Sequence, residues 1–261
     1  MKSLKELYRI GPGPSSSHTM GPQKACLEML KRCPNADHYR ADLYGSLAMT
    51  GKGHLSDQII IRTLAPRPVE VCFHMNEMKK HPNTLELHAF DAEDGLLETM
   101  TVYSVGGGVI EIEGEDAAVH APCYPHHTLD EIKAFCAAEH IGLNAYVDQF
   151  DDSDISSYLN EILIQMLKTV DAGLNASGIL PGRLKLERIA RSLLQEASDV
   201  HGSEREKLLL CAYAYAACEE NASGGMSVTA IARGLGLNKS TVSRSLARSM
   251  ERLYRSLRYS L

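Results

Sequence analysis

The sequence predicts an α+β front domain, followed by an all-α region that ends in a helix-turn-helix. Three observations predict this order. Between residues 39 and 110, short runs alternate apolar and polar residues, as half-buried strands do. After Asp152 the apolar residues recur with a helical period. The final segment carries turn glycines and many basic side chains. We therefore predict domains at residues 1–150, 151–226 and 227–261.

Composition is typical of a globular protein, with 261 residues, 44% hydrophobic and 23% charged. No apolar stretch reaches the roughly 20 residues that a membrane-spanning helix needs. The first residues, MKSLKELYRIGPG, lack the apolar core of a secretory signal. We expect a cytoplasmic protein without a membrane partner.

The elements of the front domain follow from local patterns. A Gly/Pro/Ser-rich loop at residues 11–22 leads into a helical pattern that stops at Pro34. Strand-like runs are predicted at residues 40–51, 58–65, 69–75, 85–92 and 98–114. Residues 128–142 are a predicted helix, with Thr128 as N-cap and Glu131 at the capping-box position.

Three helical patterns follow the predicted boundary at residues 148–154. The first places seven apolar residues on one face and closes near Gly173: Ile155, Leu159, Ile162, Leu163, Met166, Leu167 and Val170. The second and third span residues 184–197 and 203–220. A loop is predicted at residues 173–183, between the first pattern and the other two, and the region contains no predicted strand.

The loop at residues 11–22 is the first candidate site. Ser15, Ser16, Ser17 and Thr19 supply four hydroxyl groups, and His18 supplies an imidazole. A loop that opens a helix directs backbone N–H groups at its ligand, which suits a carboxylate or a phosphate. On composition alone, a capped surface turn remains the alternative, because serine and glycine are common turn residues.

Six blocks of sequence carry a resemblance to a known family. They are IGPGPSSSHTMGP, YGSLAMTGKGHLSD, the His81-Pro82-Asn83 block, YSVGGGVI, SGILPGRLKLERIA and EENASGGMSVTA. In this order they resemble iron–sulfur L-serine dehydratases, also called L-serine ammonia-lyases, across about 225 residues.

The resemblance implies a serine-binding front domain, similar to the allosteric domain of some phosphoglycerate dehydrogenases. It implies that Ser15, Ser16, Ser17, His18 and Thr19 face serine, and that His81 and Asn83 contact it. Members of the family convert L-serine into pyruvate and ammonia, and a [4Fe–4S] cluster acts as the Lewis acid.

The cysteines do not follow the family. Cys26, Cys33, Cys72, Cys123, Cys136, Cys211 and Cys218 include no C-x-x-C pair and do not map to the family's cluster ligands. Cluster attachment needs cysteine thiolates. We expect small buried side chains instead, and therefore no metal site and no cofactor in this chain. A [4Fe–4S] cluster is expected only where a partner chain supplies the ligands.

Residues 227–261 are predicted to bind DNA. They hold seven basic residues against the single acid Glu251, a net charge of +6, whereas the remainder has 20 basic and 32 acidic residues, a net charge of −12. Gly236 is placed at the turn and Asn238 caps the second helix. The side chains expected on DNA are Lys239, Ser240, Thr241, Ser243, Arg244 and Arg248. A helical hairpin with a solvated basic face is the alternative.

Two functions follow as hypotheses. The first is a transcriptional regulator that binds L-serine or a similar amino acid, binds double-stranded DNA as a homodimer and is inactive alone as an enzyme. The alternative is a component of an iron–sulfur L-serine ammonia-lyase that needs a separate cluster-bearing chain. A third possibility, without a function for the front half, is a chimeric remnant in which that half only stabilises the tail. His54, His126 and His127 receive no role.

Overall fold

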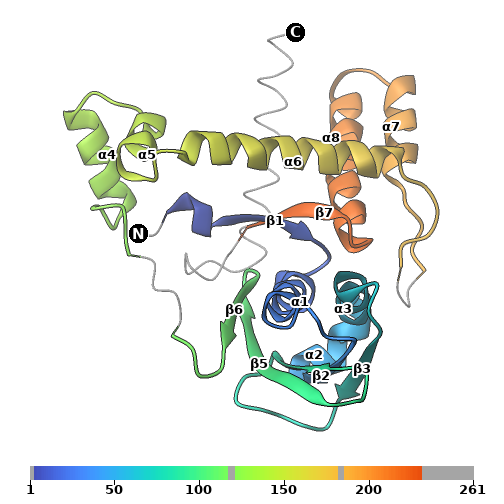
Figure 1. Ribbon diagram of the computed structural model, residues 1–261. Helices are drawn as coiled ribbons and strands as arrows, with labels where there is room; N and C mark the ends of the chain where they lie inside the picture. Colours follow the sequence, from blue (N-terminus) through green and yellow to red (C-terminus); the bar gives the residue numbers. More distant parts are fainter. Residues whose placement is uncertain (1–2, 117–120, 182–184, 231–261) are drawn as a thin grey trace.

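The computed structural model describes residues 3–116, 121–181 and 185–230, without the side chains of residues 227–230. The strands are β1 (Tyr8–Pro12), β2 (His38–Tyr44), β3 (Val69–His74), β4 (Thr84–Phe90), β5 (Leu96–Gly106), β6 (Val109–Ile112) and β7 (Met226–Ala230). The α-helices are α1 (Gly21–Arg32), α2 (Gly45–Thr50), α3 (Ser56–Leu64), α4 (Leu129–Ala138), α5 (Leu143–Phe150), α6 (Ile155–Asn175), α7 (Ala190–Asp199) and α8 (Gly202–Ala222). Short helical turns are η1 (Leu4–Glu6), η2 (Ser16–Met20) and η3 (Gly51–His54). A mixed α/β front part followed by helices is confirmed (Figure 1).

The front part is a five-stranded sheet in the order β3-β2-β4-β5-β6, with helices on one face (Figure 1). Strands β2 and β3 are parallel, and the other neighbours are antiparallel. The predicted alternation holds in β4, where Leu85, Leu87 and Ala89 are buried and Glu86 and His88 are partly exposed. One face of the sheet therefore forms the core.

The prediction of a strand at residues 58–65 is wrong, because Ser56–Leu64 form helix α3. Residues 45–50 of the first predicted strand are likewise helical, in α2. A parallel β2–β3 pair requires a crossover that brings the chain back to the same edge of the sheet. The helices supply that crossover, and this tertiary requirement overrides the strand preference of three successive isoleucines.

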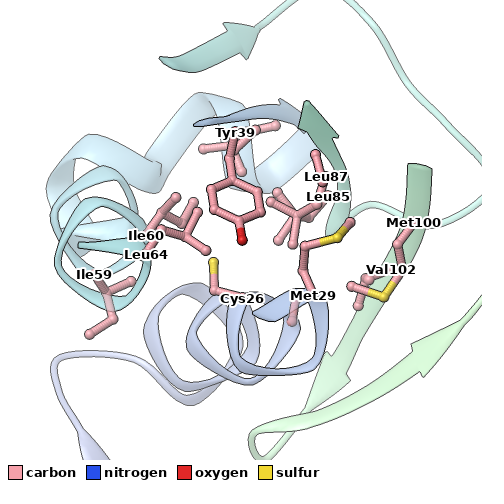
Figure 2. Packing of buried hydrophobic residues seen from close by; sticks show 14 of the residues in the cluster. Cys26, Met29, Tyr39, Ile59, Ile60, Leu64, Leu85, Leu87, Met100 and Val102 are labelled. Atoms are coloured by element: carbon pink, nitrogen blue, oxygen red, sulfur yellow. The ribbon is translucent and has the colours of Figure 1, made fainter. Parts of the chain in front are cut away.

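The core lies between the sheet and helices α1 and α3 (Figure 2). Cys26 and Met29 of α1 and Ile60 of α3 face Tyr39 and Leu87 of the sheet, and all five are fully or almost fully buried. Burial raises the pKa of the Cys26 thiol. The expectation of buried cysteines holds for Cys26, whereas Cys33, Cys72, Cys123 and Cys136 are half-buried and Cys211 and Cys218 are exposed.

A second, two-stranded sheet joins β1 near the amino end to β7. Helix α6 runs along this sheet (Figure 1). Thr169 of α6 donates its hydroxyl to the carbonyl of Met226 at 2.9 Å, and the Tyr158 hydroxyl donates to the carbonyl of Tyr8. Segments far apart in the sequence are thus bonded to one helix.

The helix predicted at residues 128–142 is confirmed as α4, with the predicted capping box between Thr128 and Glu131. It packs with α5 around Tyr124, Ile132 and Tyr146. Leu4 packs against the same cluster, so this helical pair is tied to the amino-terminal turn η1. The predicted boundary near residues 148–154 coincides with the break between α5 and α6.

Helices α6, α7 and α8 pack around Val170, Ala190 and Ala216. A side chain at Gly173 would collide with the backbone carbonyl of Ala216, so glycine permits the α6–α8 contact. The helix predicted at residues 184–197 is shorter than expected, because α7 begins only at Ala190. Within the preceding segment, Glu187 forms an isolated β-bridge with Ile179.

The predicted start of the helix-turn-helix is wrong, because residues 226–230 form strand β7 and not the beginning of a first helix. Val228 and Thr229 are β-branched and suit a strand, and β1 offers them an antiparallel edge. The DNA-contacting residues predicted between Lys239 and Arg248 lie outside the described residues. Among the described helices, none has the length and apolarity needed to cross a bilayer.

Candidate functional site

The predicted Ser/His loop forms one wide, π-helical turn, η2, directly before α1. Ser15 is the N-cap, and its hydroxyl accepts the backbone N–H of His18 at 3.2 Å. The Ser15 N–H in turn donates to the hydroxyl of Thr19 at 3.3 Å. Ser15, Ser16 and Ser17 are half-buried, whereas His18 and Thr19 are buried. The three serines are therefore the polar residues of this loop that stay partly exposed.

The imidazole of His18 is held on both sides. Nδ1 lies 2.9 Å from the hydroxyl of Ser17, and Nε2 lies 3.2 Å from both the carbonyl and the hydroxyl of Ser46. Because a carbonyl only accepts, the neutral ring carries its proton on Nε2 and accepts the Ser17 hydroxyl at Nδ1. This arrangement fixes the ring and orients the Ser17 oxygen.

Buried hydrogen bonds attach the loop to the region around η3. Thr19 donates its hydroxyl to the carbonyl of His54 at 3.0 Å. Ser56, at the start of α3, donates to the carbonyl of His18 at 2.6 Å. The rings of His18 and His54 lie 4.7 Å apart between centroids. His54, which received no role from the sequence, therefore adjoins the loop.

The predicted His81-Pro82-Asn83 block reaches the loop through Ser46. The N–H of Ser46 donates to the carbonyl of Pro82 at 2.7 Å, and Ser46 also contacts His18. Within the block, Nδ1 of His81 accepts the backbone N–H of Asn83 at 3.0 Å. Both predicted ligand motifs thus belong to one bonded network, with Ser46 between them.

Asn83 and Ser104 leave buried polar atoms for a ligand or water. The amide nitrogen of Asn83 donates to the carbonyl of Ser104 at 3.2 Å, which fixes the orientation of the amide. Among the described residues, Oδ1 of Asn83 and Oγ of Ser104 are buried without a hydrogen-bond partner. Such groups are costly unless something else satisfies them.

On its other side the loop contacts the end of α8 and the turn before β7. Gly13 donates its N–H to the carbonyl of Gly225 at 2.9 Å. A side chain at Gly13 would collide with the carbonyl of Asn221, so the two backbones approach closely. The loop therefore lies between the front sheet and the helical region.

Sequence reasoning missed several polar residues in the hydrogen-bond network of the loop and in the adjoining helical region. They are Ser46, Ser56, Ser104, Arg188, Glu219 and Asn221. Each lies inside one of the six blocks that carried the family resemblance. The available signal was therefore the polar residues of those blocks, and not only their serine and histidine motifs.

Cys26 and Cys33 pack in the front core, Cys123 and Cys136 pack around Tyr146, Cys211 and Cys218 lie on α8, and Cys72 lies on β3. Within the described residues, no group of three cysteine, histidine or acidic side chains is placed to hold a metal ion. A [4Fe–4S] cluster requires several thiolates together, and its absence from this chain stays a prediction.

A charged network covers the sheet face opposite the core. Asp42, only 2% exposed, accepts from Arg40 at 2.8 Å and contacts Nε2 of His74 at 2.6 Å. Its other oxygen lies 3.3 Å from Nε2 of His88. Burial raises the pKa of Asp42, but the bonds and charges of Arg40 and His74 outweigh burial and leave the pKa below its ordinary value.

Replacing Asp42 with asparagine should lower the free energy of unfolding by about 1–2 kcal/mol at pH 7, since charge-assisted bonds are lost. A depressed carboxyl pKa stabilises the fold above the unfolded-state value of about 4 and loses its effect as the pH falls through the folded-state pKa. Urea unfolding of both proteins from pH 7 to pH 3 should show the difference shrinking with acidity. A difference independent of pH contradicts this explanation.

Comparison with known proteins shows that part of the chain is similar to one protein family. Residues 3–71 and 67–115 match the family model described as Serine dehydratase beta chain. L-serine dehydratase 1 of Escherichia coli (strain K12) is 30% identical over 290 aligned positions, covering 90% of this chain and 63% of that protein. The L-serine dehydratase of Streptomyces coelicolor is 32% identical, with 89% of this chain and 63% of that protein covered.

The L-serine dehydratase of Helicobacter pylori (strain 26695) is 28% identical, with 89% and 63% coverage. The chain therefore spans slightly less than two thirds of the length of these relatives. Since the 290 aligned positions with the Escherichia coli protein exceed the 261 residues of this chain, that relative has additional residues within the matched region.

Proposed function

Residues 3–115 match the serine dehydratase beta chain family, and from this premise we propose that the chain binds L-serine as one component of an L-serine dehydratase. The observation that carries the proposal is the Ser/His loop, where three half-exposed serine hydroxyls stand beside a buried, oriented imidazole. The family match favours this role over that of a DNA-binding regulator.

The loop offers the groups that a small polar amino acid needs. Serine hydroxyls donate to a carboxylate or accept from an ammonium group, and both ends of L-serine are charged. Because Nδ1 of His18 accepts a hydrogen bond from the Ser17 hydroxyl, the lone pairs of the Ser17 oxygen are directed away from the ring. In this proposal the loop binds and orients L-serine, and Asn83 and His81 support His18 through Pro82 and Ser46.

The dehydration itself is assigned to a combination of chains. In the family the cluster supplies the Lewis acid that draws off the serine hydroxyl, and among the described residues of this chain no three cysteine, histidine or acidic side chains come together. We therefore assign the cluster to a partner chain, in line with the beta-chain description of the matching family. The residues of this chain are left with binding and orienting L-serine.

Calorimetric titration of the purified chain tests serine binding. L-serine should bind in preference to D-serine, and Ser17→Ala should weaken binding about 10- to 150-fold, the equivalent of one hydrogen bond to a charged group. Ser153, exposed in the turn before α6, provides the matched control Ser153→Ala, which should bind like the unmodified chain. Absence of L-serine binding to the unmodified chain contradicts the proposal.

Pyruvate formation tests the assignment of the cluster. The chain is incubated anaerobically with iron, sulfide and L-serine, alone and together with a cluster-bearing serine dehydratase alpha chain. Pyruvate is expected only from the mixture. Pyruvate from the chain alone, with cluster absorbance, refutes the assignment to a partner.

A further inference from the structure

We infer that Arg188 is the residue that takes the carboxylate group of the amino-acid ligand, an inference that rests on the proposed function. Arg188 lies in the segment before α7, far along the chain from the Ser/His loop. Its side chain is only 9% exposed, and Nη1 is buried without a hydrogen-bond partner among the described residues.

The ion pair between Arg188 and Glu220 is too long to satisfy the guanidinium. Nη2 lies 3.9 Å from Oε2 of Glu220, beyond hydrogen-bond distance. A buried charge is expensive unless it is paired and hydrogen-bonded. The fork of an arginine fits a carboxylate with two parallel bonds, so an incoming carboxylate meets this need better than water.

The backbone on both sides of Arg188 is fixed. Its own N–H donates to the carbonyl of Gly178 at 2.9 Å. The next N–H, that of Ile189, donates to the buried carboxylate of Glu219 at 2.7 Å. The guanidinium is therefore presented from a restrained segment, as a binding group should be.

Contacts lead from Arg188 to the Ser/His loop. The carboxylate of Glu220, beside Arg188, lies against Gly225, where any side chain would collide with it. The carbonyl of Gly225 accepts the N–H of Gly13, two residues before Ser15. The amide of Asn221 also donates to the carbonyl of Pro14 at 3.5 Å. Arg188 thus stands on the side of the loop that faces the helical region.

The charge complementarity favours an amino acid over other anions at this place. The guanidinium is accompanied by the carboxylate of Glu220, so an anion that also carries a positive group suits the site better than one without. A zwitterionic amino acid has both groups on one carbon atom. The partly exposed residues Ser15 to Ser17 remain for its ammonium group and its side-chain hydroxyl.

The test compares two ligands and three variants by calorimetry on the whole chain. L-serinamide keeps the amino group and the hydroxyl of L-serine but lacks the carboxylate. Arg188→Gln should weaken L-serine binding about 30- to 100-fold, as expected for loss of a buried charged partner, and leave L-serinamide binding unchanged. Arg188→Lys should give an intermediate loss for L-serine. Arg191→Gln, at an exposed position of α7, is the control and should bind both ligands normally.

Each other outcome overturns the inference. Unchanged L-serine binding in Arg188→Gln means that Arg188 pairs with another group, such as an acidic residue of a partner chain. Equal losses for L-serine and L-serinamide indicate a structural role, and an unfolding midpoint measured for each variant identifies such a case. If the unmodified chain binds neither ligand, the proposed function itself fails. If Arg188→Gln binds L-serine as well as the unmodified chain does, this inference fails but the proposed function stands.

Discussion

Replacing Gly45 with alanine should lower the free energy of unfolding by about 3 kcal/mol. Gly45 joins β2 to α2 with φ of +55°, a left-handed conformation that costs other residues about 1–2 kcal/mol. A Cβ atom there would also lie 2.5 Å from the carbonyl oxygen of Pro82, a backbone atom that cannot rotate away. The two costs add because they arise from different causes.

Urea unfolding of Gly45→Ala and of Gly53→Ala measures this cost. At Gly53, in η3, a Cβ atom would meet no described atom within 4 Å, and the backbone is not in the left-handed region. The Gly53→Ala variant should therefore stay within about 0.5 kcal/mol of the unmodified chain. Equal stability of the two variants disproves the steric explanation. Because Pro82 also accepts the N–H of Ser46, Gly45→Ala should weaken L-serine binding as well.

Gly45 illustrates what sequence could and could not predict. The block that contains Gly45 is recognisable from the sequence. The strand-like run predicted at residues 40–51 includes Gly45, whereas in the structure the strand ends at Tyr44 and helix α2 begins. The collision partner is Pro82, distant in sequence. A local pattern predicts local structure well, as in β4 and in the Thr128 capping box, and it contains no information about such distant contacts.

The candidate site divides in the same way. The Ser/His loop is a candidate site by its residue types, whereas the preference for a serine site there, and any role for the His81–Asn83 block, follow only from the family resemblance. Their connection through Ser46 depends on the sheet placing β4 beside β2, which no spacing in the sequence expresses. The role of these residues as ligands stays a prediction, as do the domain boundaries and the homodimer.

The start of helix α7 shows a second limit. Residues 184–189 have good helical composition, which predicts a helix, yet α7 begins at Ala190. The reason is a side chain about 30 residues away: Oε1 of Glu219 accepts the N–H groups of Ile189 and Ala190, at 2.7 and 3.3 Å. A capping group supplied by another helix cannot be recognised from the sequence around the cap.

Replacing Glu219 with alanine should therefore lower the free energy of unfolding by about 2–4 kcal/mol. Glu219 is 4% exposed and Ala190 is fully buried, so removal of the carboxylate leaves a buried N–H group without an acceptor, at a cost of about 1–3 kcal/mol, and opens a space in the packing. The negative charge also lies at the favourable end of the α7 dipole, which adds to the loss.

Glutamine at position 219 separates these contributions. Its side-chain oxygen can still accept both N–H groups, so Glu219→Gln should lose only about 1 kcal/mol, mainly from the missing charge. Glu196, exposed on α7, provides the control Glu196→Ala, which should change stability by less than about 0.5 kcal/mol. Urea unfolding gives the three values, and hydrogen exchange should locate the loss in the first turn of α7. If glutamine is as damaging as alanine, charge rather than capping holds the start of this helix, and the restraint on Arg188 has a different origin.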